Sequence, residues 1–395
     1  MQSSTTGAAL APATSSQSAL QILIMAIAAF IIVTTEFLIV GLLPAMARDL
    51  DVSVAVAGQV VTLFAFTVML FGPFLTAKLA GVERKKLFTV ILLVFAASNV
   101  LAALSTNIWV MALARFIPAL GLPVFWGTAS ETAGQLAGPG NAGKAVSRVY
   151  LGISAALVFG VPLGTVAADT LGWRGSFWAL AAISLIIAIL MQLCMPTLPS
   201  SPAKEHGEKQ TDILKHPRFL AHVLLSVLAF TAMFTAYTYL ADILQTLGAV
   251  PANQVGWWLM GFGAVGMIGN QWGGALVDRS PLGAMVLFLT ILAVGMMAAV
   301  PLAGNHTLLI GALILWGVAY TALFPVCQVR VMNAGVKAQA LAATMNISAA
   351  NAGIGLGAIF GGLGIGEFGL GALGWIATAI AALAIIVAVL MMRKR

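Results

Sequence analysis

The sequence has very little charge. Asp, Glu, Lys and Arg together make up 8% of the 395 residues, whereas hydrophobic residues make up 61% and there are 41 glycines. Soluble domains carry roughly 25% charged residues, because polar side chains must cover a surface that faces water. A soluble enzyme of two or three domains and a disordered chain are therefore both excluded. The composition indicates a polytopic membrane protein.

The residues of covalent and metal chemistry are equally scarce. Cys194 and Cys327, both within apolar stretches, are the two cysteines, which excludes a disulfide scaffold, and we interpret them as small buried hydrophobic residues. The four histidines are His206, His216, His222 and His306. The sequence contains no phosphate-binding Gly-Lys-Ser/Thr loop and no cluster suited to hydrolysis or metal binding. We therefore expect no enzyme, no catalytic or metal-binding residues, no cofactor and no ATP-driven transport.

The net charge of +7 is not gathered into a patch. Its only blocks lie at 84–86 and 393–395, without interleaved aromatic residues, so nucleic acid is excluded as a partner. In a membrane protein, positive charge more often sets the orientation in the bilayer.

Twelve apolar stretches are each long enough to cross a bilayer. They lie at 20–43, 55–78, 87–105, 108–130, 146–168, 175–195, 219–244, 254–277, 282–302, 307–330, 338–362 and 370–392. Residues 1–19 are uncharged and rich in Ser, Thr and Ala, and we interpret them as a flexible cytoplasmic tail. With the N-terminus inside, 16 of the 19 Lys and Arg residues fall on the cytoplasmic side. This bias predicts that both termini are cytoplasmic.

One polar, proline-rich interval, residues 196–218, divides the chain into two halves of six helices, 20–195 and 219–392, followed by a basic end at 393–395. The halves show signs of duplication. Glu83-Arg84 follows the second stretch and Asp278-Arg279 follows the eighth, 195 residues later. Glycines recur in the fifth stretch and in the eleventh. Parallel repeats of this kind are typical of secondary transporters that work by a rocking movement.

Several segments, taken in order, resemble the motifs of one family. They are Thr34-Thr35-Glu36-Phe37 running to Gly41-Leu42-Leu43-Pro44, the loop from Gly72 to Leu87, Gly273-Gly274-Ala275-Leu276-Val277-Asp278-Arg279, Arg115 with Gly121, and Gly160-Val161-Pro162-Leu163-Gly164. The chain resembles the major facilitator superfamily, in particular its twelve-helix drug:proton antiporter branch. Within that branch it is similar to bacterial sugar-efflux, arabinose-efflux-like and purine-nucleoside-efflux transporters.

The resemblance implies an all-α membrane protein with twelve transmembrane helices in two pseudo-symmetric six-helix bundles, working as a monomer in the bacterial inner membrane. It identifies Gly160, Pro162 and Gly164 as the fifth-helix antiporter motif, although Val161 interrupts the usual Gly-Pro pair. Leu122 stands where several members of the branch carry a polar residue, and this shifts the expected proton role to Glu36.

Two ionisable residues lie deep within the predicted spans. Glu36 precedes Pro44 by eight residues on an outward-running helix, and Arg115 follows Asn107 by eight on an inward-running one. Both therefore lie about 12 Å from the outer ends of their helices. Burial favours a protonated carboxyl and a nearby guanidinium favours the carboxylate, so Glu36 could bind and release a proton beside a permanently charged Arg115. A static ion pair, or Arg115 bound only to backbone carbonyls, is the alternative.

The remaining acids lie at predicted helix ends. We interpret Glu83, Arg84, Asp278 and Arg279, together with Gly72 in the loop motif, as gating residues that hold a helix end in one conformation. Glu131, Asp242 and Glu367 are expected to be solvated. The second half has no carboxylate near the middle of the membrane, which assigns proton handling to the first half.

The substrate site is predicted from weaker signals. Polar or aromatic residues in the expected cavity helices are Trp126, Tyr237, Tyr239, Gln245, Tyr320, Gln328, Asn346 and Asn351. An apolar pocket with few hydrogen-bonding groups suits a neutral or amphiphilic molecule. For each residue, packing between helices is an equally good explanation.

Taken together, these features predict a transporter driven by the proton gradient, whose partners are a small-molecule substrate, protons and the lipid bilayer. The resemblance favours export of a sugar, a nucleoside or a drug such as an amphenicol by alternating access. Uptake by proton symport and broad multidrug efflux remain alternatives. A channel is disfavoured because no repeated filter motif is present.

Overall fold

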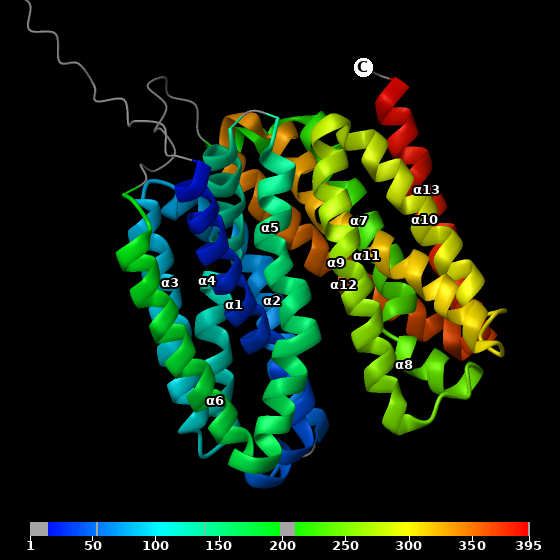
Figure 1. Cartoon of the computed structure of the whole chain (residues 1–395), viewed down its shortest axis with the longest axis horizontal. Coiled ribbons are helices and arrows are strands. Elements are labelled where there is room, and N and C mark those ends of the chain that lie inside the picture. Colours follow the sequence, from blue (N-terminus) through cyan, green and yellow to red (C-terminus); the bar gives the residue numbers. More distant parts are fainter. Residues whose placement is uncertain (1–14, 53, 139, 198–209, 394–395) are drawn as a thin grey trace, which may run out of the picture.

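The computed structural model describes residues 15–52, 54–138, 140–197 and 210–393. The first bundle consists of α1 (Ser15–Asp49), α2 (Val54–Leu79), α3 (Arg84–Ala103), α4 (Ile108–Ala137), α5 (Ala142–Ala155) and α6 (Val161–Cys194), with a π-helical turn at Ala156–Gly160. The second consists of α7 (Pro217–Tyr237), α9 (Ala252–Arg279), α10 (Pro281–Ala299), α11 (His306–Ala334), α12 (Gln339–Phe368) and α13 (Leu373–Arg393). Figure 1 shows the two bundles side by side.

Shorter helical segments connect the long ones. The short helix α8 (Leu240–Asp242) and a π-helical turn (Ile243–Leu247) follow α7, and 3-10 turns lie at Gln210–Lys215, Val336–Ala338 and Leu370–Ala372. All regular structure in the described ranges is helical.

Eleven helical segments of the described chain are long and apolar enough to cross a membrane. The remaining predicted span corresponds to α9, whose 28 residues include the polar Asn270 and Gln271 and which packs against α5 and α11. The expected break between the fifth and sixth spans lies at Gly172, whose φ of 72° interrupts the helical geometry of α6. The predicted all-α architecture of twelve transmembrane helices is confirmed.

Some boundaries differ from those expected. The first helix already begins at Ser15, so residues 15–19 belong to α1 rather than to a tail, and the rest of the predicted tail lies outside the described residues. Within the predicted linker, residues 198–209 also lie outside them, and α7 begins at Pro217. Proline is well suited to the first helical turn, because its missing N–H would have no partner there.

Side-chain caps fix the starts of four long helices. Asn107 accepts hydrogen bonds from the backbone of α4, Ser280 from α10, Asn305 from α11 and Glu83 from α3. Such caps satisfy N–H groups that have no partner within the helix.

The two bundles repeat the same close helix contact. In the first, a Cβ on Gly152 of α5 would overlap the backbone of α1 at Ala26 and Phe30. In the second, a Cβ on Gly357 of α12 would lie 2.8 Å from Thr231 O and 2.9 Å from Thr235 N, both in α7. Because glycine at these positions lets two backbones approach, the repeated contact supports the predicted pseudo-symmetry of the bundles.

We call the membrane face that carries the α6–α7 connection the linker face, and the opposite one the far face. The C-terminal end of α13 and the start of α5 also lie at the linker face (Figure 1). Large apolar side chains such as Leu70, Phe74 and Leu363 are exposed on the outside of the helices, as expected for contact with lipid. Cys327 is buried as predicted, but Cys194 is exposed, which corrects the interpretation that both cysteines are buried.

Candidate transport cavity

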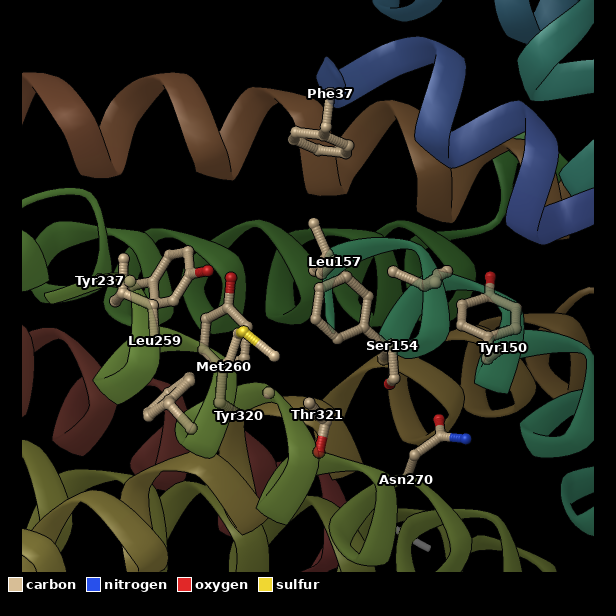
Figure 2. A pocket seen from close by; sticks show the side chains of 15 residues that line it. Phe37, Tyr150, Ser154, Leu157, Tyr237, Leu259, Met260, Asn270, Tyr320 and Thr321 are labelled. Carbon is tan, nitrogen blue, oxygen red and sulfur yellow. The ribbon is translucent and has the colours of Figure 1, made fainter. Parts of the chain in front are cut away.

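A cavity lies between the two bundles. It consists of two adjoining spaces of about 390 and 210 Å³, which share wall residues from α1, α5, α7 and α11. In Figure 2, Phe37 points from α1 toward Leu157, while Tyr237, Tyr320 and Tyr150 surround the same space. The position of the cavity follows from the repeat, because the equivalent helices of both halves face each other there.

Glu36 is half-buried in the wall of the smaller space. Among the described residues, no side chain or backbone group forms a hydrogen bond or ion pair with its carboxylate. An acid in such a place binds either a proton or a group that is not part of the protein wall.

Arg115 is buried beside Glu36 but does not pair with the carboxylate. Its Nη1 donates to the carbonyl of Thr35 at 2.7 Å and its Nη2 to the carbonyl of Glu36 at 3.0 Å. The guanidinium also lies 4.5 Å from the centroid of the Phe64 ring. The geometry therefore matches the second alternative, in which Arg115 binds backbone carbonyls, while its charge remains close to Glu36.

Aromatic residues of the second bundle form the opposite wall. The rings of Tyr237 and Tyr320 lie 4.5 Å apart, and Phe234 lies 5.7 Å from each of them. Phe324 lies 5.7 Å from Tyr320, and Phe262 lies 5.6 Å from Tyr320. Such a wall offers ring faces and edges to an apolar or planar molecule.

The structure separates the predicted cavity residues into three groups. Those that line the cavity are Trp126, Tyr237, Tyr320, Asn346 and Asn351. Gln328 is fully buried behind this wall, where it donates to Ser130 and Ala343.

Tyr239 and Gln245 do not line either space of the cavity. The hydroxyl of Tyr239 donates to the carbonyl of Ala358 at 2.9 Å, and Gln245 is exposed in the π-helical turn after α8. Both lie beyond the end of α7 near the far face, because that helix ends at Tyr237, earlier than the predicted boundary of 244.

Other cavity residues were not predicted from the sequence. Phe37, Ser154, Thr321 and Asn270 line the larger space, as does the buried Tyr150. The one signal that could have singled out Asn270 is its polarity within a glycine-rich span. Ser and Thr are too common in transmembrane helices to be informative.

Hydrogen bonds join the bundles near the linker face. Asp278 of α9 accepts from the backbone N–H of Gly143 at 2.6 Å and of Lys144 at 3.0 Å, both at the start of α5. The amide of Asn270 donates to the carbonyl of Ser147 at 2.6 Å. A carboxylate at a helix N-terminus is favoured by the helix dipole, so Asp278 closes this contact electrostatically.

Helix α12 contributes a second set of inter-bundle bonds. The hydroxyl of Thr344 lies 2.9 Å from that of Thr76 and 3.2 Å from the carbonyl oxygen of Pro123, and Ser348 donates to the carbonyl of Met69 at 3.2 Å. Gln328 of α11 adds a bond to Ser130 of α4 at 3.1 Å. We call these contacts, together with those of Asp278 and Asn270, the linker-face seam.

The predicted gating residues are not alike. Glu83 caps its own helix by accepting from the backbone of Lys85 and Lys86. Arg84 is buried and forms a 2.8 Å ion pair with Glu131. The expectation that Glu131 is solvated is therefore wrong, because α4 continues six residues beyond it, to Ala137, and carries it into the bundle.

The remaining predicted gating residues, Arg279 and Gly72, lie at an exposed helix end and at a helix contact, respectively. Arg279 is exposed at the end of α9. Gly72 lies in α2, where an added Cβ would be 2.8 Å from Pro123 of α4 and 3.3 Å from Thr344 of α12, so that glycine permits the contact of α2 with both helices.

Of the antiporter motif, Gly160 ends the π-helical turn and packs against the side chain of Thr34 in α1. Pro162 and Gly164 belong to the backbone of α6, but their side-chain surroundings lie outside the described residues. Asp242 and Glu367 are exposed, as expected. The described ranges contain no group of three or more His, Cys, Asp or Glu residues that could hold a metal ion.

Two facing helical bundles that enclose a cavity define a class of membrane transporter. A family model described as Major Facilitator Superfamily matches residues 25–335, and the chain belongs to that family. It is a multi-pass membrane transporter and not an enzyme.

Two relatives by sequence and one solved structure are similar to this chain. It is 35% identical to the "Inner membrane transport protein YdhP" of Escherichia coli K12, over 86% of this chain and 87% of that one. It is 32% identical to the "Uncharacterized MFS-type transporter YtbD" of Bacillus subtilis 168, over 90% and 91%. The fold matches that of the E. coli fucose:proton symporter FucP with a TM-score of 0.74 at 17% identity, covering 95% of this chain and 99% of that one.

Proposed function

We propose that the protein is a proton-coupled exporter of a small neutral or amphiphilic molecule in the bacterial inner membrane, working as a monomer by alternating access. The observation that carries this proposal is Glu36, an acid in the cavity wall without a protein partner among the described residues. The name of the E. coli relative supports the choice of membrane.

Proton coupling follows from the surroundings of Glu36. The guanidinium of Arg115 is held on α1 by two backbone carbonyls, so its charge acts on Glu36 in a fixed position. Burial opposes this charge by favouring the neutral acid. A substrate or a bundle movement that changes the hydration of the cavity shifts the balance and makes Glu36 bind or release a proton.

The cavity supports the substrate class. Its wall is largely aromatic and aliphatic, and the polar groups Glu36, Asn346 and Asn351 gather in the smaller space. A molecule with an apolar or planar body and one polar end fits this division.

The charge distribution assigns the linker face to the cytoplasm, because 16 of the 19 Lys and Arg residues then lie inside. On that assignment the linker-face seam closes the cytoplasmic side of the cavity. Alternation then requires the seam to open. Asp278 acts as its latch, and Arg84 holds the first bundle rigid while the bundles rock.

Everted membrane vesicles containing the protein test this function. With an acidified interior followed by a pH-sensitive dye, sugars, nucleosides, amphenicols and lipophilic cations are added in turn. Proton release on addition of one class, lost in Glu36→Gln and retained in the exposed-carboxylate control Asp242→Asn, is the expected result. Proton movement in the opposite direction would indicate uptake by symport, and release that persists in Glu36→Gln would overturn the role of Glu36.

A further inference from the structure

A continuous chain of buried polar groups runs from the second bundle into the first. Arg330 of α11 donates through Nη2 to Ser226 of α7 at 2.7 Å, and Ser226 donates to Oδ1 of Asn346 in α12 at 2.7 Å. Asn346 donates to Oε1 of Gln328 at 2.7 Å, and Gln328 donates to Ser130 of α4 at 3.1 Å. The residues of this polar chain are all 0–1% exposed.

The polar chain has one direction, and the carbonyl of Ala343 sets it. A carbonyl can only accept, so Gln328 must turn its NH₂ toward Ala343 and Ser130 and its oxygen toward Asn346. The Asn346 amide then presents its NH₂ to Gln328 and its oxygen to Ser226, which accepts from Arg330 and donates to that oxygen. No carboxylate among the described residues pairs with Arg330, and its Nη1 lies 3.0 Å from Nδ1 of His222.

Asn346 connects this polar chain to the cavity, because it also lines the smaller space near Glu36 and Asn351. Its amide still has one N–H and one oxygen lone pair unused. A ligand that rotates this amide would turn its oxygen toward Gln328. Gln328 could respond only by inverting, which would point its oxygen at the Ala343 carbonyl that now accepts from its NH₂ at 3.3 Å. Two carbonyl oxygens repel, so the Gln328 side chain would have to turn away from Ala343, and its present bond to Ser130 would be lost with that movement.

We propose that this polar chain couples the cavity to the linker-face seam. Asn346 senses a substrate group that both donates and accepts hydrogen bonds, such as a hydroxyl or an amide. The bond from Gln328 to Ser130 is the inter-bundle contact that Asn346 controls, and Arg330 and Ser226 are positioning residues. The inference rests on the proposed function only in placing the substrate in this cavity.

The test needs no substrate. Spin labels are placed on Gln135→Cys and Val336→Cys, two exposed positions at the linker face in opposite bundles, in a Cys194→Ser background because Cys327 is buried. Distance distributions in lipid nanodiscs then report the fraction of molecules with an open linker face. Ser130→Ala removes the inter-bundle bond itself, whereas Ser226→Ala acts wholly within the second bundle.

Both variants should raise the open fraction about fivefold, the effect of losing one buried hydrogen bond. The double variant should shift it no further, because both changes act on the same bond. Asn346→Leu should reproduce the shift. The matched control is Thr235→Val in α7, since Thr235 is buried and bonds only to the carbonyl of Thr231 in its own helix; its distances should equal those of the wild type.

A wild-type distribution in Ser226→Ala beside a shifted one in Ser130→Ala would overturn the coupling, as would additive shifts in the double variant. These outcomes differ from a failure of the proposed function, since an exporter of another substrate, or an uptake permease, leaves the distances unchanged.

Discussion

The two acidic-basic turns of the duplicated sequence, Glu83-Arg84 and Asp278-Arg279, have come to do different things. Glu83 caps the helix that follows it, and Arg84 is buried against Glu131 in the same bundle. Asp278 instead caps α5 of the opposite bundle, and Arg279 is exposed. One turn consolidates a bundle, while the other holds two bundles together.

The cavity walls show the same division. The first bundle contributes the carboxyl of Glu36, with Arg115 bound to the backbone beside it, and the second contributes the aromatic cluster around Tyr320 and the amides of Asn346 and Asn351. The side chains to which we assign proton handling and those to which we assign substrate binding thus lie in different copies of one repeated scaffold.

The largest expected effect concerns the charged wall. Glu36→Gln mimics the protonated acid permanently, so substrate-driven proton release in everted vesicles should fall to the background of vesicles that lack the protein. Exchange of substrate down its own gradient should persist. If active transport were retained with unchanged pH dependence, proton handling would not reside in the first bundle.

The next effect concerns the ion pair within that bundle. Glu131→Ala leaves the buried Arg84 without its carboxylate, which should lower the free energy of unfolding by about 3–5 kcal/mol. Denaturation in detergent micelles measures this change. Replacing both partners, as in Arg84→Met with Glu131→Leu, should recover most of the loss, and a double variant as unstable as Glu131→Ala would contradict the explanation.

The third effect concerns the two acidic-basic turns and the closure of the linker face. Asp278→Asn weakens a charge-assisted contact between bundles and should raise the open fraction at the linker face about tenfold. Glu83→Gln should change that fraction far less, since the bonds that Glu83 accepts from the backbone of Lys85 and Lys86 lie at the start of its own helix. The label pair at positions 135 and 336 measures both. Equal shifts would show that the turns have not diverged in function.

A change in the aromatic wall should alter the affinity for substrate but not the pH dependence of transport. Tyr320→Leu removes the ring that contacts Tyr237, Phe234 and Phe324, and should raise the KM for transport about tenfold. The pH dependence of proton release should stay as in the wild type. Altered pH dependence would show that the two walls do not act separately.

The smallest effect lies outside the membrane-spanning segments. Asp49 accepts from the Trp173 indole at 2.9 Å and from Arg174 at 2.6 Å, and these bonds hold the pKa of Asp49 below its ordinary 3.8. The pair is partly exposed, so Asp49→Asn should cost less than about 1 kcal/mol at pH 7. The contribution of Asp49 is complete above its unfolded pKa and is lost as the pH falls through the lower folded value. Unfolding followed at pH 7 and pH 3 tests this sign; a difference between wild type and variant that grows at pH 3 would contradict it.

Much of the fold could be predicted because each membrane span depends on the apolar residues of one continuous segment of the sequence. The number of spans follows from apolar length, and the caps at Asn107, Ser280 and Asn305 follow from residue type. The shared depth of Glu36 and Arg115 followed from counting residues along two helices. Whether the two side chains pair could not be predicted, since a guanidinium can also bind backbone carbonyls, and only the packing of α1 on α4 decides which acceptor is nearer.

The residues of the cavity could be predicted only in part, because residue type can be read from the sequence but orientation within a helix cannot. Tyr237 and Tyr320 were identified as aromatic residues in cavity helices, and both line the cavity. Tyr239, two residues further along, does not, because the end of α7 turns it toward α12. Tyr150 and Asn270 were missed, since nothing in a single sequence indicates which face of a uniformly apolar helix looks into the cavity.

The sequence by itself determined the class of protein, its twelve spans, its two halves and the depth of Glu36 in the membrane, because each depends on transferring a residue or segment from water into lipid. Only the tertiary structure decided that Glu131 pairs with Arg84, that Asp278 reaches across to α5, and that a polar chain connects Arg330 to Ser130 through Asn346. These are directional contacts of short range between helices that are all apolar, and their partners are set by how the helices pack.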